Sequence, residues 1–121
     1  MKEEFTFFWR SRSPFSQWYQ GAPFVLHGIT FRDAETYMMW FKGGFAGNMA
    51  KFTQNPAILP ELLKTAGTTL VEASPSDSIW GIGLEESDPR AADRATWRGM
   101  NWLGQTLTEV RDTILKARNA L

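Results

Sequence analysis

The segment LVEASPSDSIWGIGL, residues 70–84, restricts the possible folds of this chain more than any other feature. Its apolar start is typical of a buried strand, and the Ser-Pro-Ser-Asp sequence that follows is typical of a turn. The next four residues are Trp-Gly-Ile-Gly, in which the glycines allow a close approach of the backbone and Trp80 offers a flat aromatic face. The residues alone favour a tight turn packed under a tryptophan, and the alternative is a loop that contacts a ligand.

Length and composition limit the remaining choices. The 121 residues predict one domain over 1–121, and the balance of 13 basic against 13 acidic residues gives no overall field that would attract a polyanion. A ligand with negative charge would therefore have to meet local charges in a pocket. The absence of cysteine excludes disulfides, thiolate metal sites and a cysteine nucleophile. With no long apolar run and no signal-peptide pattern, we expect a soluble, cytoplasmic protein without membrane contact.

The single histidine, His27, lies between two short β-rich runs, 24–26 and 29–31. The pair His27-Gly28 is suited to a two-residue hairpin loop, so we expect a solvated turn at this position. One histidine without cysteine makes a transition-metal cluster improbable, and a Ser-His-Asp triad would have to be built on a hairpin tip. We therefore expect no metal and no cofactor.

Periodicity predicts an α+β domain that is predominantly α-helical with a small β component. An aromatic strand is expected at Phe5–Trp9, followed by a basic loop. Asp33 can cap a helix from Ala34 to Lys42 that Gly43 ends. Further helical patterns cover 49–65, interrupted by two prolines, and the C-terminal region from Leu103, whose apolar stripe comprises Leu103, Leu107, Val110 and Ile114.

Several charged residues are candidates for ligand binding. Arg10 and Arg12 stand among serines and are able to hold a phosphate, although the same residues fit a solvated loop. Arg98 stands before Asn101, which is a good helix-capping residue, so this segment fits either a phosphate site or a cap beside a surface arginine. Lys51 and Asn55 lie on one face of a predicted helix, where either is able to contact a ligand, but we assign them to the polar surface of that helix.

The predicted helix at 34–42 places Glu35 and Lys42 on one face, about 20° apart around the axis and about 10 Å apart along it. They are too far apart for an ion pair. Either both side chains reach a ligand that lies along the helix, or they are the solvent-exposed ends of a methionine-rich helix face.

Five blocks in a fixed order resemble the NADAR family, also called the YbiA-like family, whose members are N-glycosidases that act on ribosylated nitrogen compounds. The resemblance covers nearly the whole chain. The chain departs from the family pattern in two places. Family members usually carry a long, mostly helical segment between the second and third blocks, and here only residues 43–46 stand in its place. Thr36 stands where many relatives have histidine. The blocks are FSQWY at 15–19, AETYMM at 34–39, AKFTQNP at 50–56, SPSD to WGIG at 74–83, and WRGMNWLG at 97–104.

The resemblance implies a compact YbiA-like domain and a set of site residues. Glu35 would be the carboxylate that stabilises an oxocarbenium-like state, and Lys42 would be the nucleophile that forms a Schiff base with an opened ribose. Asp77 would bind ribose hydroxyls or assist proton transfer, although it fits an Asx turn equally well. The ligand-binding residues would be Arg10, Arg12, Phe15, Ser16, Trp80, Gly81, Arg98 and Asn101.

The expected function is therefore hydrolysis of a C–N glycosidic bond in a ribosyl-phosphate or ADP-ribosyl compound. The family's two substrate classes are the ribosylamino-pyrimidine intermediates of riboflavin biosynthesis and ADP-ribosylated guanine in nucleic acid. The neutral net charge argues against long nucleic-acid contacts but is compatible with a single modified base. The alternative is a non-catalytic module that binds ADP-ribose or a nucleotide and that lost activity with the shortened central segment.

Overall fold

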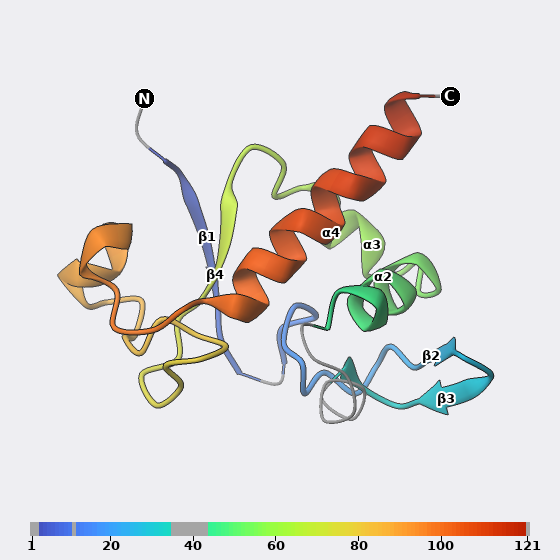
Figure 1. Ribbon diagram of the computed structural model, residues 1–121, viewed down its shortest axis with the longest axis horizontal. Helices are drawn as coiled ribbons and strands as arrows, with labels where there is room; N and C mark the ends of the chain where they lie inside the picture. The colour runs from blue at the N-terminus through green and yellow to red at the C-terminus, as the bar shows by residue number, and fades with distance from the viewer. Residues whose placement is uncertain (1–2, 11, 35–43, 121) are drawn as a thin grey trace.

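Two parallel strands form the centre of the fold. The computed structural model describes residues 3–10, 12–34 and 44–120. In it, β1 (Phe5–Phe8) pairs with β4 (Thr69–Glu72), with Phe5 opposite Thr69 and Phe8 opposite Glu72. Figure 1 shows the two strands side by side, with helix α4 (Trp102–Asn119) running diagonally across the molecule. Strands from the two halves of the sequence thus share one small sheet.

The second edge of β4 is bonded to side chains of α4 and of the residue before it. Leu70 N donates to Thr108 Oγ1 at 2.9 Å, and Asn101 Nδ2 donates to Leu70 O at 3.0 Å. Glu72 N donates to Asn101 Oδ1 at 3.0 Å, and Ile82 N donates to Glu72 O at 3.0 Å. Because unpaired backbone groups are costly to bury, these bonds allow β4 to be buried without a second neighbouring strand.

Helix α4 approaches β4 closely enough to require glycine at position 104. A Cβ atom at Gly104 would lie 2.2 Å from Leu70 O and 2.4 Å from Asn101 Oδ1. Neither neighbour can move, because both belong to the hydrogen bonds that hold β4. The contact between helix and strand is therefore set by one small residue.

The apolar stripe of α4 forms the main core. Its residues Leu103, Leu107, Val110 and Ile114 are all buried, as the sequence predicts. Figure 1 shows α2 (Phe45–Thr53) and α3 (Leu59–Leu63) on one side of this helix and the two strands on the other. Phe8, Phe52 and Leu62 from these neighbouring elements complete the cluster. The predicted α+β class with a small β component is confirmed.

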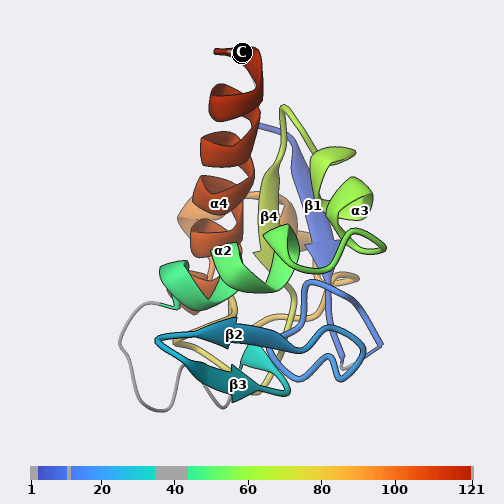
Figure 2. The ribbon, with the colours of Figure 1, turned by 90° about the vertical axis from the view of Figure 1, so that its right-hand side faces the viewer.

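The predicted hairpin is also confirmed. Strands β2 (Phe24–Leu26) and β3 (Ile29–Phe31) are antiparallel, and both loop residues, His27 and Gly28, have positive φ, at 56° and 74°. These values fit the two-residue turn that matches strand twist. The hairpin lies at the lower end of the molecule in Figure 2 and is tied to α2 through Gln54, which bonds both Val25 N and Val25 O.

Two expectations need adjustment, and a third concerns residues that lie mostly outside the described part of the chain. The helical pattern at 49–65 is two helices, of which α2 begins at Phe45 after Gly44 in left-handed conformation. Asn101 precedes α4 as expected, but its side chain makes no capping bond because both polar atoms bond to β4. Asp33 precedes helical Ala34, while the rest of the predicted helix lies outside the described residues.

We predict that Asn101→Ala lowers the free energy of unfolding by about 2–4 kcal/mol, because it leaves Leu70 O and Glu72 N buried without partners. Urea unfolding followed by circular dichroism measures this loss. Asn119→Ala, at the exposed end of the same helix, is the matched control. Equal stability of the two variants would contradict the role assigned to Asn101.

Candidate functional site

A cavity of about 400 Å³ lies where β1 and β4 end. Because the strands are parallel, their carboxyl ends meet at the same edge of the sheet, and the loops that follow them diverge there. Its volume is in the range of small-molecule sites. We call it the β1–β4 cavity, and its lining residues are Phe7, Phe8, Trp9, Arg10, Ser13, Phe15, Ala73 and Glu86.

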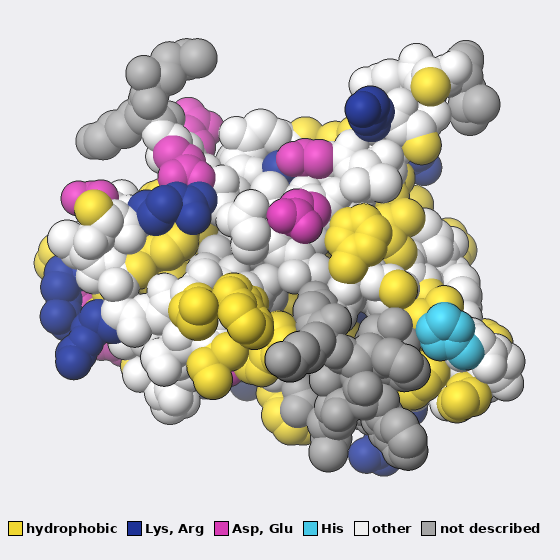
Figure 3. Space-filling view, viewed as in Figure 1, with side chains coloured by type: hydrophobic (Ala, Val, Ile, Leu, Met, Phe, Trp, Pro, Cys, Tyr) yellow, Lys and Arg dark blue, Asp and Glu magenta, His cyan; other side chains and the backbone are white. Residues whose placement is uncertain are grey.

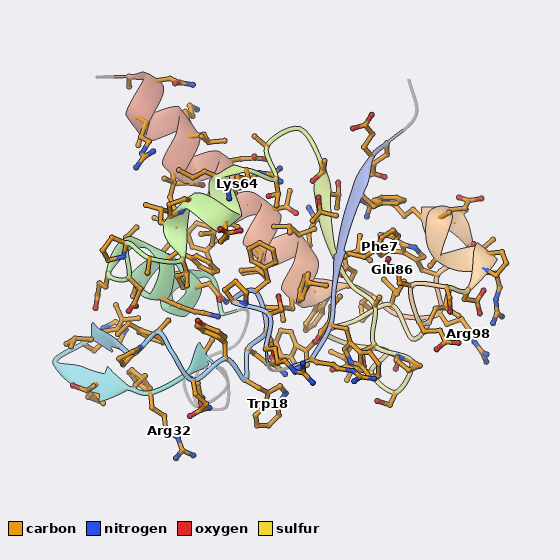
Figure 4. The ribbon with its side chains drawn as sticks, turned by 180° about the vertical axis from the view of Figure 1, so that it is seen from behind. Phe7, Trp18, Arg32, Lys64, Glu86 and Arg98 are labelled. Atoms are coloured by element: carbon orange, nitrogen blue, oxygen red, sulfur yellow. The ribbon has the colours of Figure 1, made fainter. Side chains whose placement is uncertain are left out.

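The β1–β4 cavity carries one positive and one negative side chain that do not pair with each other. The Arg10 guanidinium lies over the Trp9 ring, 4.8 Å from its centroid. Within the described part of the chain, neither the Arg10 side chain nor the Glu86 carboxylate makes a hydrogen bond or ion pair. Figure 4 shows Glu86 beside Phe7, close to β1. The cavity therefore offers aromatic faces, a guanidinium and a carboxylate to a ligand.

The backbone at Arg10 is held in an unusual conformation. Its φ is 77°, in the left-handed region that residues other than glycine rarely adopt. The following turn fixes it, because Ser13 N donates to Arg10 O at 3.1 Å and Phe15 N donates to Ser13 Oγ at 3.2 Å. Such strain is concentrated at functional sites. The role of this loop in binding stays a prediction.

Arg98 lines a different cavity, of about 360 Å³, together with Pro75, Ser76, Ser78 and Gly83. Figure 4 places Arg98 toward the outer edge of the molecule, away from Phe7 and Glu86. Arg12 is exposed and lines neither cavity. The three candidate arginines thus do not converge, and the role of each in binding stays a prediction.

The Ser-Pro-Ser-Asp turn is held by Asp77. Its Oδ1 accepts hydrogen bonds from Ile79 N at 2.9 Å and Trp80 N at 2.8 Å, which is the Asx-turn geometry. A Cβ atom at Gly81 would lie 2.9 Å from Glu72 O, so internal packing accounts for this glycine. Trp80 is half-buried and packs edge-to-face against Trp102, with centroids 5.8 Å apart. Ligand contact by these residues stays a prediction.

Of the other predicted site residues, Phe15 lines the β1–β4 cavity with Arg10, and the remaining ones are dispersed. Phe15 is buried against Phe8, with ring centroids 5.6 Å apart. Ser16 is buried, and its hydroxyl accepts a bond from Trp18 N. Asn101 is fully buried with both side-chain polar atoms bonded. Glu35 and Lys42, predicted to be catalytic, lie outside the described residues.

Lys51 is the residue that sequence analysis placed most wrongly. It was assigned to a helix surface, but its side chain is fully buried, and its Nζ donates to Ser16 O at 2.9 Å. The rings of Tyr19 and Phe52 lie 5.7 and 5.1 Å from Nζ. Burial lowers the pKa of Lys51 to about 7, and the negative charge of Asp33 acts in the opposite direction. Lys51 ties α2 to the segment that begins at the β1–β4 cavity.

The described part of the chain holds no group of three metal-binding side chains close enough to bind an ion. No helix in that part is long and apolar enough to cross a membrane.

The fold matches the NMR structure of the Escherichia coli protein YbiA, with a TM-score of 0.71 at 20% identity, over 98% of this chain and 89% of that one. Residues 44–115 match the NADAR domain, and the chain therefore belongs to the NADAR domain family. The resemblance inferred from the sequence is confirmed.

Curated relatives match about half of the chain. Over 66 residues it is 50% identical to Protein irg-1 of Caenorhabditis elegans and 47% identical to N-glycosidase R617 of Acanthamoeba polyphaga mimivirus. Each match covers 54% of this chain, and 31% and 39% of those proteins, respectively. Over 65 residues, also 54% of the chain, it is 42% identical to the maize riboflavin biosynthesis protein PYRR, covering 9% of that protein. The matched part thus spans about a third of the first two relatives.

We predict that Lys51 makes stability depend on pH. Its pKa is about 7 in the folded state and near 10.5 in the unfolded chain. Between these values only the unfolded chain binds the proton, so the free energy of unfolding rises with pH across this window, and below it Lys51 contributes no slope. Urea unfolding at about pH 7 and about pH 9.5 measures the rise. Lys51→Met should lose this contribution and exposed Lys64→Met should keep it. Equal slopes in the two variants would contradict the prediction.

Proposed function

We propose that this protein is an N-glycosidase that hydrolyses the C–N bond between a ribosyl-phosphate or ADP-ribosyl group and a nitrogen base. Membership of the NADAR family and relatives named N-glycosidase support the class of reaction. The observation that carries the proposal is the β1–β4 cavity. Its aromatic walls suit a base, and the Arg10 guanidinium with the Ser13 hydroxyl suits a phosphate or ribose.

The reaction adds water to the anomeric carbon. The electron pair of the broken C–N bond leaves with the nitrogen, which takes a proton, so the products are a free sugar and an amine. In this proposal Glu35 stabilises the oxocarbenium-like state or takes a proton from water. In a covalent route, Lys42 is proposed to attack C1 of the opened ribose, where the base nitrogen is still bonded as an iminium. The base leaves with the electron pair of the C–N bond and a proton, and water then hydrolyses the Lys42 Schiff base to the free sugar.

Asp77 has a secondary place in this scheme. Its Oδ1 is occupied by the two backbone bonds of its turn. Its Oδ2 makes no hydrogen bond within the described part of the chain, so we propose that this oxygen meets a ribose hydroxyl or assists proton transfer.

The two candidate substrate classes are ribosylamino-pyrimidine phosphates and ADP-ribosylated guanine. The relative named as a riboflavin biosynthesis protein favours the first. The charge distribution is also more compatible with a small molecule than with a long nucleic acid. On the face drawn in Figure 3, basic side chains of the described residues form small separate groups, and the whole chain is neutral. A protein that follows a phosphate backbone needs a continuous basic surface.

We predict that incubation with ribosylamino-pyrimidine phosphate releases free sugar, detected by mass spectrometry, and that Glu35→Ala and Lys42→Ala each reduce the rate at least about 100-fold. ADP-ribosylated guanosine, assayed in parallel, identifies the substrate class. Binding of either compound without release of sugar would contradict the glycosidase and favour the non-catalytic binding module.

We predict that Arg10→Gln raises KM about tenfold with little change in kcat, because it removes a charged contact to the phosphate that does not change during the reaction. Steady-state kinetics with the released sugar as readout measures both constants. Arg118→Gln, on the exposed end of α4, is the matched control. A larger effect on KM from Arg98→Gln would indicate that the phosphate binds in the cavity lined by Arg98, and would contradict its assignment to Arg10.

A further inference from the structure

Glu86 is a feature of the β1–β4 cavity that sequence analysis did not select. It lies on the loop after Leu84 and is exposed, yet it lines the same cavity as Trp9 and Phe15. A carboxylate accepts hydrogen bonds and donates none, and its two oxygens suit two parallel donors. In the described part of the chain no such donor reaches Glu86, although Arg10 lines the same cavity.

The chemistry of the walls limits which donors a ligand would bring. The aromatic rings of Trp9, Phe7 and Phe15 favour a planar group that can lie against them. Arg10 already lies over Trp9 at the cavity, so a second guanidinium is not favoured there. A planar group with two adjacent N–H donors is then a nitrogen heterocycle in which a ring N–H stands beside an amino group. This is the arrangement of a 2-amino-4-oxopyrimidine ring.

We propose that Glu86 determines base specificity by accepting two parallel hydrogen bonds from the ring N–H and the amino group of a 2-amino-4-oxopyrimidine edge. The inference rests on the proposed function in that it places the base of the substrate in the β1–β4 cavity. Guanine, the base of the second substrate class, carries this edge. Binding of its edge to Glu86 leaves the sugar directed away from this carboxylate.

Glu86 is not a catalytic residue in this proposal. The two bonds are made in the bound substrate and persist through the reaction, so they contribute to binding and to choice of base, with no special gain in the transition state. A bidentate contact of this kind discriminates by about 1–3 kcal/mol, which corresponds to about a 5- to 150-fold preference in Kd.

Binding of GMP and IMP tests the proposal, because the two nucleotides differ only in the 2-amino group. Isothermal titration calorimetry gives the two dissociation constants for the intact chain. We expect GMP to bind at least about fivefold more tightly than IMP. Glu86→Gln should remove this preference, since an amide offers one acceptor in place of two. Glu85→Gln, which changes the exposed neighbouring carboxylate outside the cavity, should keep it.

Three results would overturn the proposal. The first is failure of the wild-type protein to bind either nucleotide. The second is equal binding of GMP and IMP by the wild type. The third is a preference for GMP that survives in Glu86→Gln while circular dichroism shows the fold intact. This test measures binding, whereas release of sugar tests the glycosidase proposal. If no sugar is released, the binding test still decides the role of Glu86.

Discussion

The second edge of β4 is the constraint on which the rest of the structure depends. A two-stranded sheet leaves the outer edge of each strand without a ladder, and at the outer edge of β4 Asn101 and Thr108 replace the missing strand with side-chain bonds. Those bonds require α4 to lie directly against β4, which only glycine at position 104 permits. With α4 fixed there, its apolar stripe defines the core, and the carboxyl ends of β1 and β4 are left to the loops that form the cavity.

The loop beside that cavity is restrained at both ends. β1 anchors its start, and the turn around Ser13 holds Arg10 in left-handed conformation. At its far end, the carbonyl of Ser16 accepts the bond from the buried Lys51 of α2. Burying an amine is costly unless a partner accepts its hydrogen bond, so the Ser16 carbonyl is held beside Lys51. A surface lysine, which water can solvate, would place no such requirement on Ser16. The contact between Lys51 and Ser16 fixes residues 12–16 between sheet and helix and keeps the cavity walls in place.

Local sequence predicted the parts of the fold that depend on local chemistry. The hairpin follows from His27-Gly28, and the apolar stripe from Leu103 onward follows from helical periodicity. Sequence could not predict where polar side chains are buried, because this depends on contacts between distant segments. Lys51 is predicted on a helix surface but bonds Ser16, 35 residues away, and buried Arg111 bonds Thr65, 46 residues away. Glu86 was missed for the same reason, since only the meeting of β1 and β4 brings its loop beside Arg10.

The arrangement separates recognition from chemistry along the chain. The proposed contacts to base and phosphate fall on residues that follow β1 and β4, where Arg10 and Glu86 line one cavity without pairing. Had the two charges bonded to each other, each would be satisfied and the cavity would have little polar attraction for a ligand. The proposed covalent step depends instead on Glu35 and Lys42, in another part of the sequence. A member of the family could therefore lose the reaction and keep the binding site, because different segments and different physical requirements maintain the two.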